Sequence, residues 1–195
     1  MQEYKIKTFP NLGKLKKIPH VQISEHLKLY EGYVKNTNTL ISLLKEKIAK
    51  QDLEGALFAE LVRRLGFEYN GMLLHELYFE NLNAKGGNQN SAKKLKKLIT
   101  QNFSSFDAFK PYFLKVGAMR GIGWVILYQD AKTKQLSVHW INSHEDGHVA
   151  GFKPIIVMDV WEHAWSAYLK PTERAKYIED FWSNIDWTVC EDRLI

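Results

Sequence analysis

The chain has 195 residues, a formal net charge of +5, 45% hydrophobic residues and 13% aromatic residues. This composition excludes a disordered polypeptide, and the length suits one large domain or two small ones. No segment approaches the roughly 18 apolar residues of a membrane span, and the N-terminus lacks the apolar region of a signal peptide, so we expect a cytoplasmic protein. The single cysteine, Cys190, allows no intramolecular disulfide and is expected to pack on a helix.

Lysine residues cluster at residues 14–17 and 93–97. Both clusters fall in short segments that we expect to be solvated, and no groove-reading motif accompanies them. We therefore expect no nucleic-acid partner. The positive charge is suited instead to attracting a small anion toward a site.

The first 20 residues are punctuated by proline and glycine, which predicts an extended lead-in. A long helical pattern then begins near Ser24, its candidate N-cap. A second helix is predicted from about residue 53 to residue 82, with interruptions near Gly66 and Gly71. Two long helices separated by a short break predict an antiparallel hairpin.

The polar, glycine-containing segment at residues 84–90 is the strongest linker signal in the chain. It predicts an N-terminal helical hairpin domain over residues 1–86 and a C-terminal α/β domain over residues 87–195. In the second domain we predict helices over 91–102, 105–120 (capped by Ser104 or Ser105), 172–185 and 188–193, and strands over 124–128, 136–141 and 154–158. The predicted fold class is α+β, with a small three-stranded antiparallel sheet after the hairpin.

Asp159 and His163 place a carboxylate and an imidazole four residues apart at the end of the third predicted strand. The residues that follow suit a helix, so this pair is expected at the C-terminal end of a strand and in the first helical turn. An oxygen and a nitrogen donor together suit iron, manganese or zinc better than calcium or magnesium. A mononuclear site needs at least a third ligand.

Two further histidines stand alone on the long N-terminal helices, His26 near the start of the first and His75 within the second. In an antiparallel hairpin the start of one helix lies beside the end of the next, so these side chains can face each other. With Asp159 and His163 they compose a set of three imidazoles and one carboxylate.

At these residues the chain resembles the iron/manganese superoxide dismutases, and the resemblance covers nearly its whole length. Residues 159–164, Asp-Val-Trp-Glu-His-Ala, are similar to the signature segment of that family. Residues 33–38 are similar to the tyrosine-valine stretch of the family, and residues 75–79 to the segment that carries its second ligand. Residues 121–124 match its glycine-tryptophan strand start, and residues 177–182 and 186–187 look like its closing helix. The resemblance implies a helical hairpin followed by an α/β domain, in agreement with the pattern of elements.

The resemblance implies that the ligands of one iron or manganese ion per subunit are His26, His75, Asp159 and His163. It implies a superoxide dismutase, which converts superoxide to dioxygen and hydrogen peroxide. It also implies a homodimer, or a tetramer, in which Glu162 contacts the partner's His163.

The resemblance further implies that Tyr33 and His144 are the catalytic residues, with Tyr33 as the gateway of the substrate funnel and Trp124 and Trp161 as apolar walls. His144 stands where many family members have a glutamine that hydrogen-bonds the solvent on the metal. Because an imidazole titrates and an amide does not, we predict stronger pH dependence and looser metal discrimination than in a glutamine-bearing relative. His139 and His148 are expected to lie outside the site.

The chain also departs from the family around its first ligand and at Ser166. The family commonly has its first ligand eight residues before the gateway tyrosine, whereas His26 precedes Tyr33 by seven residues and Glu25 precedes it by eight. If the common form carries a one-residue bulge that is absent here, His26 and Tyr33 share one face of a regular helix, and we favour His26 over Glu25 as the ligand. Ser166 stands where an interface tyrosine is usual, which alters the expected dimer contacts.

Several alternatives stay open at this point. The metal-selective glutamine of iron-preferring relatives is replaced by Gly71 or Met72, which favours manganese or dual-metal use only weakly. A non-haem iron oxygenase normally uses two histidines and one carboxylate, and four protein ligands leave too little room for its substrates. The main alternative to a dismutase is a diverged family member that binds metal without catalysis.

Overall fold

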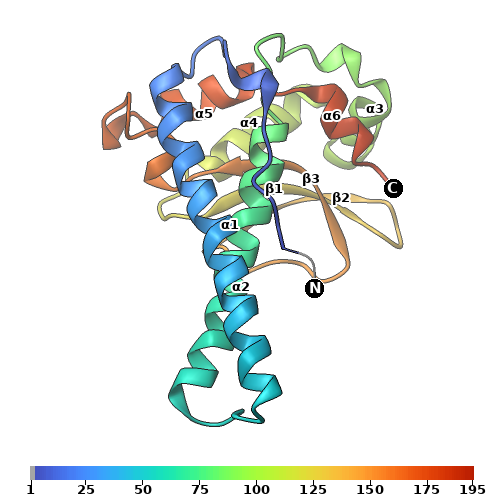
Figure 1. Cartoon of the computed structure of the whole chain (residues 1–195). Coiled ribbons are helices and arrows are strands. Elements are labelled where there is room, and N and C mark those ends of the chain that lie inside the picture. The colour runs from blue at the N-terminus through green and yellow to red at the C-terminus, as the bar shows by residue number, and fades with distance from the viewer. Residues whose placement is uncertain (1–2) are drawn as a thin grey trace.

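Helices α1 (His20–Ala49) and α2 (Gly55–Glu80) run antiparallel and form a hairpin whose far end projects from the rest of the molecule (Figure 1). The structure, a computed structural model, describes residues 3–195. The hairpin predicted from the sequence is therefore confirmed, although its details differ at two places.

The first helix begins four residues earlier than predicted. Pro19 occupies the N-cap in an extended conformation, with φ −71° and ψ 155°, and its carbonyl accepts a hydrogen bond from Gln22 N at 3.0 Å. Proline suits a helix start because its φ is fixed and its missing N–H needs no partner there. Ser24 therefore lies inside the helix, and the predicted cap is wrong.

Helix α2 is continuous, so the interruptions predicted at Gly66 and Gly71 are wrong. A glycine inside a helix costs about 1 kcal/mol relative to alanine, and tertiary packing outweighs that cost here. At Gly71 a Cβ atom would lie 2.6 Å from Cδ1 of Tyr33 and 3.1 Å from Cδ2 of His144. This glycine therefore lets two aromatic rings pack directly on the helix backbone.

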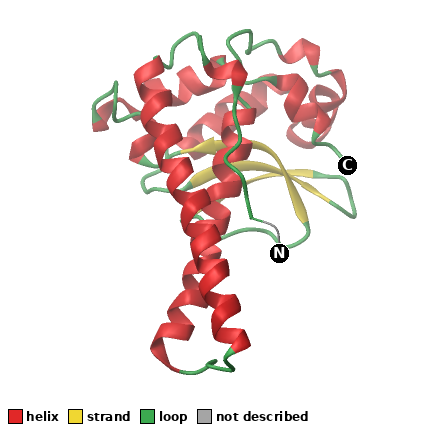
Figure 2. Ribbon diagram, viewed as in Figure 1, coloured by secondary structure: helices red, strands yellow, loops and turns green. Residues whose placement is uncertain are grey.

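The sheet contains three antiparallel strands, as predicted (Figure 2), and their order is β2-β1-β3. The strands are β1 (Trp124–Asp130), β2 (Leu136–Ile141) and β3 (Phe152–Asp159). The register pairs Trp124 with Ile141 on one side and with Asp159 on the other. One end of the sheet thus brings together the start of β1, the end of β3 and the loop that follows β2.

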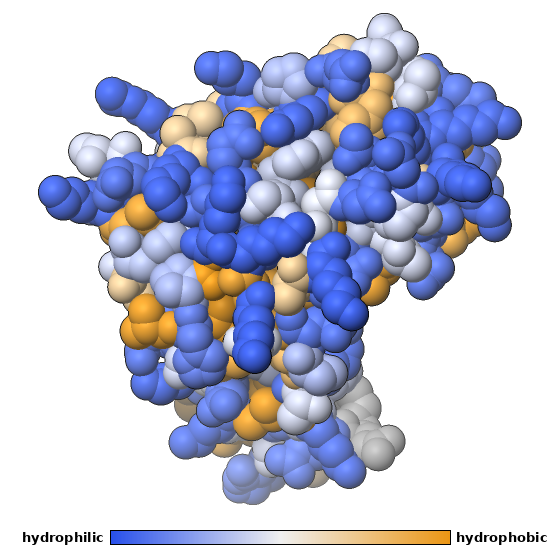
Figure 3. All heavy atoms as spheres, turned by 90° about the horizontal axis from the view of Figure 1, so that it is seen from above, coloured by the Kyte–Doolittle hydropathy of each residue, from blue (hydrophilic) through white to orange (hydrophobic). Residues whose placement is uncertain are grey.

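Four shorter helices cover the sheet on the side drawn above it in Figure 1: α3 (Lys93–Phe103), α4 (Phe106–Gly117), α5 (Arg174–Ser183) and α6 (Trp187–Asp192). Ser105, one of two predicted caps, accepts a hydrogen bond from Ala108 N at 2.9 Å and caps α4. Viewed from above, this face is covered mainly by hydrophilic side chains (Figure 3).

The α-helix predicted directly after Asp159 does not form. The chain makes a single 3-10 turn there, η3 (Glu162–Ala164). Oδ1 of Asp159 accepts a hydrogen bond from Trp161 N at 2.8 Å, and such a side-chain acceptor competes with helical hydrogen bonding. The tight turn nevertheless keeps His163 close to Asp159.

One hydrophobic core includes residues of the hairpin, the sheet and the shorter helices. Just after α2, Asn81 donates through Nδ2 to Val157 O at 2.5 Å and accepts from Arg193 at 2.7 Å. Cys190 is fully buried nearby, and burial raises the pKa of its thiol to about 12, as suits a packing residue.

The predicted domain boundary at residues 86 and 87 falls in the irregular segment between α2 and α3. No helix among residues 3–195 has the length and apolar character needed to cross a bilayer.

Candidate metal centre

Four side chains from four elements converge near one end of the sheet: His26 from α1, His75 from α2, Asp159 from β3 and His163 from η3. Their ligand atoms all lie within 4.8 Å of one another. Oδ2 of Asp159 is 3.1 Å from Nε2 of both His26 and His163. The same oxygen is 3.7 Å from Nε2 of His75. The structure thus brings together the four residues that the sequence predicts as ligands.

The hairpin places its two histidines as the antiparallel geometry predicts. The rings of His26 and His75 lie edge to face, with centroids 5.0 Å apart and an interplanar angle of 85°. α1 is an unbroken α-helix, so His26 and Tyr33 share one face of it. Glu25 is exposed and pairs with Lys28 at 2.7 Å, so His26 and not Glu25 enters the cluster.

Gln22 joins α1 to the turn that carries His163. Its Nε2 donates to His163 O at 2.6 Å, and its Oε1 accepts from Ala167 N at 2.9 Å. Gln22 is fully buried, and it was not among the residues predicted for the site. The one signal that points to it is its position four residues before His26, which places both on the same face of the helix.

Three residues of the cluster are fully buried, and their protonation states are those of metal ligands. His26, His75 and Asp159 have no exposed side-chain surface. Burial lowers the pKa of His26 and takes the pKa of His75 well below its ordinary value, so both rings are neutral. Burial acts to raise the pKa of the Asp159 carboxyl, but the charge of His163 and the hydrogen bonds of His163 and His26 outweigh it and hold that pKa below its usual range. The neutral rings of His26 and His75 and the ionised carboxylate of Asp159 are forms that coordinate metals.

The orientation of His75 fits a metal ligand. Its Nδ1 lies 2.6 Å from the carbonyl oxygen of Gly71, which assigns the proton to Nδ1 and leaves a lone pair on Nε2. That Nε2 is buried and has no hydrogen-bond partner among residues 3–195. A metal ion within the cluster would satisfy this lone pair. Three nitrogens and one carboxylate oxygen form a donor set suited to iron, manganese or zinc.

Tyr33 and His144 lie beside the cluster and bond to each other. Nε2 of His144 is 2.7 Å from Oη of Tyr33, and Nδ1 of His144 accepts from Nε1 of Trp124 at 3.0 Å. The Tyr33 ring is tilted against His75, with centroids 4.9 Å apart. Because Nδ1 accepts, the proton of the neutral His144 ring lies on Nε2, and Nε2 donates a hydrogen bond to Oη of Tyr33.

This arrangement changes the expectation for His144. Both of its ring nitrogens have protein partners, so its one ring proton is directed to Tyr33 instead of into the cluster. Burial lowers the pKa of His144 to about 4, although the charge of Asp159 acts to raise it. The ring is therefore neutral near pH 7, and the pH dependence predicted from its titration is expected at acid pH.

Aromatic rings enclose the site. Trp161 stacks on His163 with ring centroids 5.9 Å apart and packs against His144 at 5.0 Å. Phe67, which the sequence analysis did not single out, lies 4.5 Å from the ring of His144 and 6.2 Å from that of Tyr33. The one sequence feature that could have pointed to Phe67 is its position eight residues before His75 on the same helix. These rings line the site with apolar surface.

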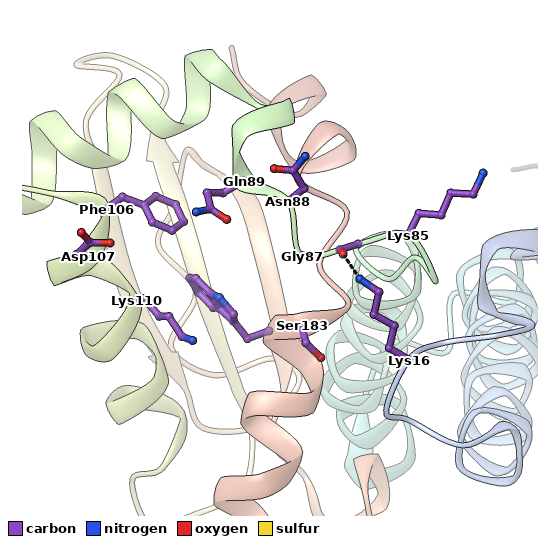
Figure 4. Close-up of a pocket in the computed structure, with 11 residues that line it drawn as sticks. Lys16, Lys85, Gly87, Asn88, Gln89, Phe106, Asp107, Lys110 and Ser183 are labelled. Carbon is purple, nitrogen blue, oxygen red and sulfur yellow. Dashed lines mark hydrogen bonds between the residues drawn. The ribbon is translucent and has the colours of Figure 1, made fainter.

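A separate surface cleft of about 710 Å³ is lined by residues of α4, α5 and the loop after α2 (Figure 4). Lys16, Lys85, Lys110 and Phe106 contribute to its walls, and Nζ of Lys16 donates to the carbonyl oxygen of Gly86 at 2.8 Å. None of the four clustered residues lines this cleft, so the candidate metal centre is a site enclosed between secondary-structure elements and not part of this opening.

Comparison with known proteins points to one family. Residues 91–193 match the family model described as iron/manganese superoxide dismutases, C-terminal domain. The chain is 34% identical to the superoxide dismutase [Fe] of Saccharolobus solfataricus, over 85% of this chain and 79% of the relative. It is 34% identical to the superoxide dismutase [Fe] of Aquifex pyrophilus, over 92% and 85%, respectively. It is 31% identical to the superoxide dismutase [Mn/Fe] of Aeropyrum pernix, over 91% and 82%.

The fold and the cluster define a class of metalloprotein with a mononuclear site between a helical hairpin and an antiparallel sheet. Within that class, the matches over most of the chain decide the family. The chain belongs to the iron/manganese superoxide dismutases. The family resemblance read from residues 159–164 is thereby confirmed.

Proposed function

We propose that this chain is a superoxide dismutase that uses His26, His75, Asp159 and His163 to hold one iron or manganese ion per subunit. The reaction consumes two superoxide anions and two protons and releases one dioxygen and one hydrogen peroxide. When bound, iron or manganese supplies the one-electron redox couple that this reaction needs, whereas zinc has no accessible redox step. The convergence of three imidazoles and one ionised carboxylate in a buried cluster carries the proposal.

The charge of the ligand set suits a small anionic substrate. Only Asp159 contributes a negative charge, and neutral imidazoles leave the charge of a bound divalent or trivalent cation largely uncompensated. Superoxide, a small anion, is attracted to such a centre. The rings of Phe67 and Trp161 restrict entry to small molecules.

Tyr33 is positioned to hold a proton at the edge of the cluster. Burial, with a contribution from the charge of Asp159, raises the pKa of its hydroxyl, so the phenol stays protonated. His144 donates its ring proton to Oη of Tyr33, which leaves the hydroxyl hydrogen of Tyr33 free to point into the site. We propose that Tyr33 thereby donates a hydrogen bond to substrate or solvent, and that His144 orients it.

We propose that the site accepts either iron or manganese. Gly71 offers no side chain to distinguish them, since a Cβ atom there would already meet the rings of Tyr33 and His144. The relatives named above carry iron or both metals in their names, and this supports use of iron at least.

We further propose a cytoplasmic homodimer. Glu162 is exposed and precedes a ligand, His163, whose side chain is 22% exposed, so a partner subunit covering this face would complete the burial of the site. Sedimentation of the metal-loaded protein is expected to give a dimer. A Glu162→Ala variant is expected to weaken it, and a wild-type monomer at micromolar concentration would contradict the interface.

The proposed activity is tested on protein reconstituted separately with iron, manganese and zinc. Metal content is measured on each sample, and superoxide decay is followed per bound metal. We expect about one metal per chain in every sample, and dismutation with iron, manganese or both but not with zinc. Stoichiometric iron and manganese binding without dismutation would favour the alternative, a family member that binds metal without catalysis.

A further inference from the structure

His144 lies in a segment without regular secondary structure. Residues 142–151 connect β2 to β3, whereas the four clustered residues and Tyr33 lie on α-helices, on the last residue of a strand or in a 3-10 turn. A functional side chain must be held within about 0.5 Å of its working position, and loops hold side chains less well than helices or strands do. This loop therefore needs anchors of its own.

Two histidines provide those anchors. Among residues 3–195, the hydrogen bonds that join residues 143–151 to distant parts of the chain come from His144 and His148. The remaining hydrogen bonds of this segment are local, such as the one between Ser143 and Glu145. Because the ring of His144 is itself the functional group, His148 is the independent anchor.

The hydrogen bonds of His148 have a defined direction. Its Nε2 lies 2.7 Å from the carbonyl oxygen of His144, and its Nδ1 lies 2.7 Å from Oη of Tyr128. A carbonyl oxygen only accepts, so Nε2 carries the hydrogen of this bond, and with the ring hydrogen on Nε2 the Nδ1 atom accepts from the Tyr128 hydroxyl. The chain of donors runs from Tyr128 through His148 to the backbone of His144.

Strand β1 holds His144 at two points through this arrangement. Trp124 and Tyr128 are four residues apart on β1, so their side chains emerge on the same face. Trp124 bonds the ring of His144, and Tyr128 holds its backbone through His148. Both β1 residues are buried, with exposures of 0% and 2%, which makes them rigid supports.

We propose that His148 is a positioning residue for the dismutase site: by donating to the His144 carbonyl it keeps the His144 ring between Trp124 and Tyr33. The proposal rests on the proposed function, because the orientation of Tyr33 matters only if Tyr33 acts on substrate. His148 touches none of the clustered ligands. Its effect therefore passes through the bond between His144 and Tyr33.

The test compares two substitutions of His148 in protein loaded with iron or manganese. His148→Gln keeps an N–H donor near the position of Nε2, whereas His148→Leu has similar bulk and no donor. We expect His148→Leu to bind metal normally and to lower kcat about 10-fold, as is common when a supporting hydrogen bond is lost, with little change in KM. His148→Gln is expected to stay within about twofold of wild type.

Deuterium exchange of residues 143–149 gives a readout that does not depend on turnover. We expect faster exchange in His148→Leu and wild-type exchange in His148→Gln. Equal kcat and equal exchange in His148→Leu and wild type would overturn the proposal, and so would equal losses of kcat in His148→Leu and His148→Gln. If wild-type protein shows no dismutation, the proposed function fails, and the exchange rates still test the anchoring role of His148.

Tyr128→Phe provides a second variant if His148→Leu fails to bind metal. It keeps the His148 ring and removes the hydroxyl that donates to Nδ1 of that ring. We expect lower kcat and faster exchange of residues 143–149 than in wild type. Wild-type values of both in Tyr128→Phe would overturn the proposal.

Discussion

Nε1 of Trp124 donates to Nδ1 of His144 at 3.0 Å, and this bond decides where the ring proton of His144 lies. With Nδ1 occupied, the only ring hydrogen is on Nε2, which faces Oη of Tyr33 at 2.7 Å. A buried indole therefore controls the hydrogen bonding of the phenol beside the metal cluster. Loss of the indole N–H would free His144 to adopt the other tautomer.

Trp124→Phe is expected to lower dismutase activity about 10-fold without loss of the metal, because His144 would no longer be fixed as a donor to Tyr33. Trp187→Phe is the matched control. Trp187 is 2% exposed, and its Nε1 has no hydrogen-bond partner among residues 3–195, so this change removes bulk but no bond. Activity per bound metal is the measurement. Equal activities in the two variants would argue against the role given to Trp124.

Gly71→Ala is expected to destabilise the protein by about 1–3 kcal/mol and to reduce activity, because the added Cβ would lie 2.6 Å from Cδ1 of Tyr33. Gly32→Ala is the control within α1, where nothing lies within 4 Å of the added atom. That change is expected to stabilise by up to about 1 kcal/mol through helix propensity. Denaturant unfolding and activity measure both effects, and stabilisation by Gly71→Ala would contradict the packing of Tyr33 on the helix.

The pH dependence of stability is expected to differ between wild type and His144→Gln. Burial lowers the folded-state pKa of His144 to about 4, against roughly 6.5 in the unfolded chain. Between these values the unfolded state binds more protons, so the contribution of a neutral His144 is complete above pH 6.5 and is lost as the pH falls toward 4. From pH 7 to pH 5, wild type should lose about 2 kcal/mol more than His144→Gln with the same metal bound. Parallel stability curves for the two proteins would refute this prediction.

The four-residue cluster was predictable from the sequence because each of its members has a local signal. Asp159 and His163 lie four residues apart at a strand end, and His26 and His75 stand alone on two helices whose hairpin geometry follows from their lengths. The structure brings these four residues together. The order of helices and strands was predictable for the same reason, since hydrophobic periodicity is local.

The features that the sequence did not predict depend mainly on contacts between distant parts of the chain. Gly71 was predicted to interrupt α2, whereas packing by Tyr33 and His144 holds it in the helix. Gln22 bonds to a carbonyl 141 residues away, and His148 bonds to Tyr128, 20 residues away on β1. No local pattern marks such partners. The short turn after Asp159 was likewise missed because its carboxylate bonds the backbone, which residue propensity does not report.

The most direct test of the metal centre is the rate of superoxide decay per chain, with metal content, in His26→Ala and Glu25→Ala. The two residues are adjacent on α1, and Glu25 is exposed and paired with Lys28, an interaction of small free energy. We predict that Glu25→Ala matches wild type, whereas His26→Ala loses both most of its bound iron or manganese and its dismutation. Full metal content and wild-type superoxide decay in His26→Ala would contradict the assignment of the site.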